Sequence, residues 1–188
     1  MQPFLFRKAL ENIMKKNKKV LMMITASMFL AIAYILPFLT GQISQIGNML
    51  CPMHIPVILC GFFCGAGWGG LVGIIAPILR SCTLGMPVLF PTAVCMAFEL
   101  GIYGLVSGVL YKMLPKKKSS IYLSLLSAMI AGRIVWGIAM FVSMGLSGNS
   151  FGLQAFFAGA VLNAIPGIVL QIVAIPVLVM IFDKTNRE

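Results

Sequence analysis

The hydrophobic positions of the chain gather into six apolar segments that are separated by short polar stretches. A helix needs about 20 mainly apolar residues to span a bilayer, and most of the segments reach or exceed that length. The second and third are shorter and are joined by "GAGWGG" (65–70), so four- and five-segment arrangements stay open there. We predict six membrane helices, over residues 19–39, 54–66, 69–82, 88–112, 119–146 and 154–182.

Composition supports an integral membrane protein that is all-α. The 188 residues are 60% hydrophobic and 10% charged, whereas soluble domains are roughly 25% charged. We expect a single six-helix membrane domain over residues 19–182 and a cytoplasmic tail over 183–188. Residues 1–18 alternate apolar and basic groups, which is typical of an amphipathic lead-in that lies on the membrane surface.

The distribution of positive charge predicts the orientation in the membrane. Fourteen basic residues stand against four acidic ones, and in a soluble protein such an excess would suggest nucleic acid. Here all of the basic residues except Arg80 and Arg133 lie in 1–19, 112–118 and 183–188, and the predicted outer loops carry none. Cytoplasmic loops are enriched in Lys and Arg, so we expect both termini in the cytoplasm, a multi-pass protein of the bacterial plasma membrane and no nucleic-acid partner.

Two charged residues lie deep inside predicted helices. Glu99 is ~17 Å below the outer end of the fourth segment and Arg133 ~20 Å below that of the fifth, at 1.5 Å per residue. An isolated charge at the bilayer centre costs at least ~3 kcal/mol. We therefore predict that Glu99 and Arg133 form an ion pair. This pair either only fixes the helix packing or also borders a polar cavity for a solute.

Other polar and aromatic residues favour such a cavity. Tyr103 lies one turn below the acid and Trp136 about one turn above the arginine, and both offer flat surfaces for stacking. Asn163 is roughly ten residues into the last segment, and Gln154 lies at its outer end. Together they place polar groups in the outer half or the middle of the last three helices.

His54 and Arg80 are expected near the outer surface. Arg80 could bind an anionic solute, or its long side chain could extend to the membrane interface. The stretch "TGQISQIGNMLCPMH" (40–54) is long enough to fold over the outer mouth of the bundle, and it is either a lid or an ordinary solvated loop.

The sequence gives little support for catalysis or for a bound metal. "GLSG" (145–148) mimics a motif of intramembrane serine proteases, but their serine needs a base within reach, and the only histidine lies on an earlier segment. The cysteines lack the spaced second half of a zinc site. We expect no metal, no cofactor and no catalytic residue. A membrane enzyme that uses Glu99 or Ser147 and a membrane assembly protein remain the alternatives.

Five stretches carry a resemblance to a known family: "HIPVILCGFFCG" (54–65), "GLVGIIAPILRS" (70–81), "PTAVCMAFELGIYGLVSGVLYK" (91–112), "GRIVWGIAMF" (132–141) and "NAIPGIVLQ" (163–171). The chain resembles the substrate-binding S components of energy-coupling factor (ECF) transporters, which take up vitamins in bacteria. It looks closest to the group often assigned to pantothenate.

The resemblance implies a division of labour. This chain would bind a vitamin from outside, while a transmembrane coupling subunit and two cytoplasmic ATPases would supply the energy. In the family, an A-x-x-x-A pattern on the first helix faces the coupling subunit, and Ser27 and Ala31 occupy those positions here.

The resemblance also implies a ligand between the outer loops and the outer halves of the last three helices. The carboxylate of pantothenate would need Arg80 or Arg133, and its hydroxyl or amide groups could bond Asn163 and Gln154. A neutral vitamin such as a pyridoxine or a hydroxymethylpyrimidine would need neither arginine, and a folate component is a further alternative.

Overall fold

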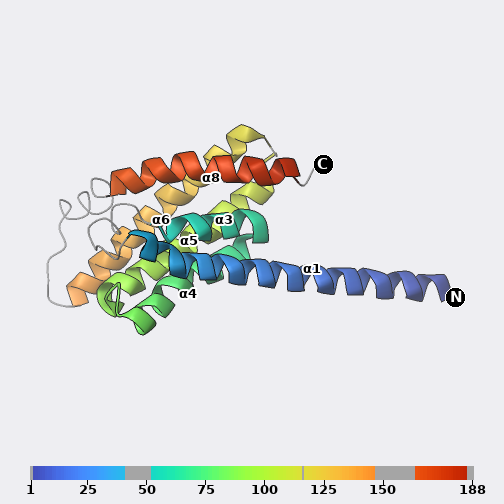
Figure 1. Ribbon diagram of the computed structural model, residues 1–188, viewed down its shortest axis with the longest axis horizontal. Coiled ribbons are helices and arrows are strands. Elements are labelled where there is room, and N and C mark those ends of the chain that lie inside the picture. The colour runs from blue at the N-terminus through green and yellow to red at the C-terminus, as the bar shows by residue number, and fades with distance from the viewer. Residues whose placement is uncertain (1, 41–51, 116, 147–163, 186–188) are drawn as a thin grey trace.

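The described part of the protein is helical throughout. The computed structural model describes residues 2–40, 52–115, 117–146 and 164–185. No strand occurs in these ranges, and the helices lie side by side as a bundle (Figure 1). The elements are α1 (Gln2–Ile35), η1 (Leu36–Thr40), α3 (His54–Cys64), α4 (Ala66–Leu84), η2 (Leu89–Ala93), α5 (Val94–Met113), α6 (Lys118–Leu146) and α8 (Ile165–Thr185).

Five of these helical stretches are long and apolar enough to cross a membrane: Asn17–Phe38, Ala66–Leu84, Leu89–Met113, Lys118–Leu146 and Ile165–Phe182. The second predicted segment is different, because α3 has only 11 residues. At 1.5 Å per residue it is ~16 Å long, about half of a ~30 Å hydrocarbon core. An all-helical fold with five candidate spans is therefore confirmed, while six spans and the orientation of the termini stay predictions.

The connection between α3 and α4 is shorter than we predicted. Instead of a stretch of several residues, Gly65 alone separates the two helices. Its φ of 89° lies in the region that residues with a Cβ rarely adopt. The glycine therefore lets the chain reverse at once and brings α4 back along α3 as a tight hairpin.

Glycines on three helices allow the hairpin to pack directly on the backbone of α5. A Cβ placed on Gly69 would lie 2.6 Å from the Cα of Gly61 and 2.7 Å from the carbonyl oxygen of Gly104. A Cβ on Gly108 would lie 2.8 Å from the carbonyl oxygen of Gly61. Close approach of this kind provides van der Waals contact between membrane helices, so the glycine rows of the sequence form one interface.

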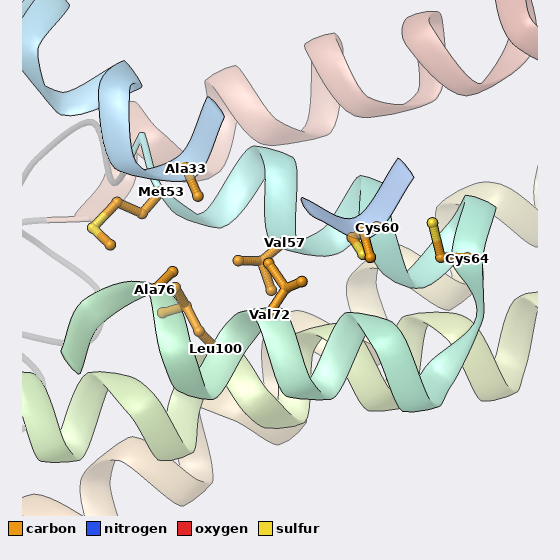
Figure 2. Close-up of a cluster of buried hydrophobic side chains, with 9 residues drawn as sticks. Ala33, Met53, Val57, Cys60, Cys64, Val72, Ala76 and Leu100 are labelled. Carbon is orange, nitrogen blue, oxygen red and sulfur yellow. The ribbon is translucent and has the colours of Figure 1, made fainter. Parts of the chain in front are cut away.

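Two apolar clusters fill the bundle. The first joins α1, α3, α4 and α5, and Figure 2 shows its members Ala33, Met53, Val57, Val72 and Leu100. The second joins α3, α5, α6 and α8 around side chains such as those of Ile58, Tyr103, Leu125 and Ile175. Since α3 and α5 contribute to both clusters, they form the centre of the bundle.

The first helix is continuous from Gln2 to Ile35 and extends well beyond the other helices (Figure 1). No break marks the predicted boundary between residues 18 and 19, and the position of residues 1–18 at the membrane surface stays a prediction. Ala26 and Ala33 face the bundle and are buried, whereas Met28 and Ile32 on the opposite side are exposed. The exposed side of α1 is thus apolar and smooth.

Candidate functional site

The predicted ion pair between Glu99 and Arg133 is present. Nη1 of Arg133 lies 3.1 Å from Oε1 of Glu99, so α6 and α5 are joined by opposite charges inside the bundle. The same oxygen accepts a hydrogen bond from the hydroxyl of Tyr103 at 3.2 Å. Nε2 of His54 lies 3.6 Å from it. We call Glu99, Arg133, His54 and Tyr103 the polar cluster.

His54 corrects one expectation of the sequence. We placed it near the outer surface, but only 2% of it is exposed, and its ring meets that of Tyr103 edge-on at 5.2 Å. The reason is that α3 begins at His54 and packs along α5, which brings its first residue against Glu99. The first residue of α3 therefore lies at the depth of Glu99.

A glycine on α6 makes room for the tyrosine of the cluster. Gly132 is buried beside the ring of Tyr103, and a Cβ at this position would overlap the ring atoms Cε1 and Cδ1. It would also lie 3.1 Å from the carbonyl oxygen of Glu99. The absence of a side chain thus allows α6 to approach α5 closely enough for the neighbouring Arg133 to reach the carboxylate.

The two members of the ion pair differ in exposure. The side chain of Glu99 is 2% exposed and that of Arg133 is 16% exposed. The carboxylate is therefore enclosed, and the cation forms the more accessible side of the cluster.

Arg80 is buried and lies against α1. Its Nη1 donates a hydrogen bond to the carbonyl oxygen of Tyr34 at 2.9 Å, in the last turn of α1. Its guanidinium also lies 5.0 Å from the ring centre of Phe38. A cation is favourable at the C-terminal end of a helix, so Arg80 fastens α1 to α4. Whether the side chain binds an anionic solute or extends to the membrane interface stays a prediction.

The structure describes only some of the remaining predicted site residues. Trp136 is half-buried on α6. Asn163, Gln154, Ser147 and most of the predicted lid lie outside the described residues. No group of three potential metal-binding side chains occurs within the described residues.

Two buried residues escaped sequence reasoning. Gly132 was not distinguished from other glycines, because only the packed structure shows the ring against it. Gln171 on α8 is 1% exposed. A lone glutamine between apolar residues of a predicted helix is the signal that could have identified it.

Comparison with known proteins decides the family. The family model described as "ECF transporter, substrate-specific component" matches residues 21–179. The chain belongs to this family. Comparisons with curated proteins and with solved structures each gave no match. As an ECF substrate-specific component, the chain is a substrate-binding subunit of a transporter, and the family is not an enzyme family.

The two residues expected to meet the coupling subunit of the ECF transporter both lie on the exposed side of α1. Ser27 and Ala31 are exposed, one turn apart. The hydroxyl of Ser27 donates a hydrogen bond to the carbonyl oxygen of Met23 at 3.0 Å, within the helix. Because this bond satisfies the hydroxyl locally, the serine behaves as a small residue on an apolar surface.

Proposed function

We propose that this ECF substrate-specific component binds a small anionic vitamin from outside the bacterial plasma membrane, with pantothenate as the best candidate. The observation that supports this most directly is the polar cluster itself. A buried ion pair with a histidine and a tyrosine is expensive to maintain among membrane helices, and charged residues inside membrane helices commonly mark the path or the site of a solute.

The exposure of the pair indicates how an anion would approach. Arg133 is the accessible member, and its guanidinium carries five N–H donors in a planar fork that suits a carboxylate. A carboxylate on the solute could therefore share Arg133 with Glu99. Trp136 lies three residues, about one turn, from Arg133, and in our proposal its ring covers the apolar part of such a solute.

Arg80 also favours an anionic solute. Arg80 contacts a backbone carbonyl and an aromatic ring, and no described acidic side chain forms an ion pair with it. A buried cation without a carboxylate adds to the positive potential of the outer half of the bundle. In our proposal Arg80 attracts the anion, while Asn163 and Gln154 bond its hydroxyl or amide groups.

The exposed side of α1 is the proposed contact with the energy-coupling partners. We infer that a transmembrane coupling subunit packs on Ser27 and Ala31 and links the chain to two cytoplasmic ATPases. Small residues one turn apart permit close approach of another helix. Ala31→Leu should abolish co-purification with the coupling subunit but keep vitamin binding, whereas Ile32→Leu, a neighbouring change without added volume, should keep both.

The test of the substrate is direct identification. The chain is purified from cells, bound small molecules are identified by mass spectrometry, and binding of pantothenate, pyridoxine, hydroxymethylpyrimidine and folate is measured by calorimetry. We expect pantothenate to bind more tightly than the other three vitamins. Absence of any bound molecule, together with no binding of the four vitamins, would refute a vitamin-binding role for this chain.

A neutral vitamin is the second candidate, and one observation favours it. Glu99 already balances the charge of Arg133, so a solute need not supply a carboxylate. The double variant Glu99→Gln with Arg133→Gln separates the two candidates, because it removes both charges together. It should lose pantothenate binding if the solute is an anion and retain most binding of a neutral vitamin.

A further inference from the structure

Gln171 is a buried polar residue that the proposed site does not use. It lies on α8 and is 1% exposed, and its side-chain oxygen has no hydrogen-bond partner within the described part of the chain. An amide oxygen that is buried without a partner costs about 1–3 kcal/mol. The unpartnered oxygen of Gln171 is therefore suited to accept a hydrogen bond from another molecule.

The apolar cluster below the site fixes where Gln171 lies. Ile58 of α3, Tyr103 of α5, Met129 of α6 and Ile175 of α8 belong to one cluster of buried side chains. We call these four residues the apolar layer; Tyr103 belongs to it through its ring and to the polar cluster through its hydroxyl. Helix α8 packs against both α3 and α6, so the layer joins four neighbouring helices.

Four polar residues each lie four positions, about one helical turn, from a member of the apolar layer: His54, Glu99, Arg133 and Gln171. Helices α3, α5 and α8 run in one direction and α6 runs in the other (Figure 1). The polar residue precedes the layer in the first three helices and follows it in α6. All four therefore lie at the same end of the apolar layer, and Gln171 is at the level of the polar cluster.

A second buried group at this level also lacks a partner. Both ring nitrogens of His54 are buried without a hydrogen bond to the described residues, although Nε2 lies 3.6 Å from the carboxylate of Glu99. Thus α3 and α8, which pack against each other, each carry a buried group with unused hydrogen-bonding capacity. Two such groups at one level indicate a place for a polar solute better than either does alone.

We propose that Gln171 is a specificity-determining residue of this substrate-specific component. Its Oε1 accepts a hydrogen bond from a hydroxyl or amide N–H group of the solute, and His54 bonds a second polar group beside it. The substrate is then a small molecule that carries at least one such donor close to its anionic group. This inference rests on the proposed vitamin-binding function, because it needs a solute in the polar cluster.

The test replaces Gln171 by methionine, which has a similar volume and no amide. Thermal unfolding without ligand is measured first, in detergent. Because the replacement removes an unpartnered acceptor, Gln171→Met should keep or raise the Tm of the unliganded protein. A clear fall in Tm would show that the glutamine serves the packing of the bundle, and it would overturn the proposal.

Binding of pantothenate is then measured by calorimetry for the wild type and for Gln171→Met. We expect the variant to bind about ten- to hundred-fold more weakly, which corresponds to the loss of one hydrogen bond in an enclosed site. Leu170→Met, on the exposed side of the same turn, is the matched control and should bind as the wild type does. If the wild type prefers another vitamin of the panel, the same comparison is made with that vitamin.

The outcomes separate the two proposals. A wild type that binds no vitamin refutes the proposed function, and the role of Gln171 falls with it. A wild type that binds tightly, together with Gln171→Met of equal affinity, keeps the proposed function and overturns this inference. That result would mean that only an internal water molecule satisfies the amide oxygen.

Discussion

The ion pair between Glu99 and Arg133 makes a quantitative prediction about stability. Replacing either residue by glutamine leaves the other charge buried without its counter-charge, and such losses cost about 3–5 kcal/mol. We expect the lower end of this range for each single variant. Arg133 is 16% exposed and so keeps some hydration, while Glu99 keeps its hydrogen bond from Tyr103.

The double variant should be much more stable than the sum of the two single losses implies. With both charges removed, no uncompensated charge remains, and two glutamines can bond each other. If each single change costs about 3 kcal/mol and the double change also costs about 3 kcal/mol, the coupling energy is about 3 kcal/mol. For a chain of this length each single loss corresponds to a fall of roughly 6–12 °C in Tm.

The assay is unfolding in detergent, followed by tryptophan fluorescence. Trp136 lies three residues from Arg133 and reports on the region that changes. The matched control pairs Glu99→Gln with Lys112→Gln, since Lys112 is exposed at the far end of α5, ~20 Å away along the helix. The control pair should be additive. If the losses of Glu99→Gln and Arg133→Gln also add to within about 0.5 kcal/mol, the two charges do not stabilise each other.

Three further predictions concern the packing. Gly69→Leu should prevent folding, because its Cβ would meet the backbone of two helices, whereas Gly67→Leu, which has open space around it, should fold. The yield of monodisperse protein distinguishes the two variants, and equal yields would contradict the glycine interface. Gly132→Ala should lower Tm by several degrees and weaken vitamin binding, since the added methyl group would displace the ring of Tyr103. An unchanged Tm would show that this ring is free to move. Arg80→Gln should speed hydrogen exchange in the last turns of α1 relative to α5, and unchanged exchange there would argue against its role in fastening α1.

The ion pair between Glu99 and Arg133 could be predicted from the sequence for two physical reasons. Lipid disfavours an isolated charge so strongly that a lone acid and a lone base in neighbouring helices must meet. The constant rise of a helix then converts positions along the chain into depths. These two arguments sufficed for Glu99 and Arg133, and the structure places their charged atoms 3.1 Å apart.

The same arguments did not reveal the contacts of His54 and Arg80, for a different reason in each case. Depth can be counted only from a helix that starts at the membrane surface, and α3 starts inside the bundle. Arg80 is satisfied by a backbone carbonyl of α1 and by an aromatic ring. Neither partner carries a charge, so no pattern of charged residues in the sequence could indicate it.

The level of Gln171 in the bundle could have been inferred from the sequence if one core residue of the same helix had been known. A single polar residue in an apolar helix is ambiguous, because its side chain can face lipid, a neighbouring helix or a solute. The ambiguity ends once a core residue one turn away is known, since Ile175 fixes which side of α8 faces the apolar layer. Residues one turn from such anchors on all four helices then share one level. The ion pair supplies the depth of that level and the glutamine supplies its unused acceptor, so in our proposal the specificity of the site follows from helix register as much as from charge.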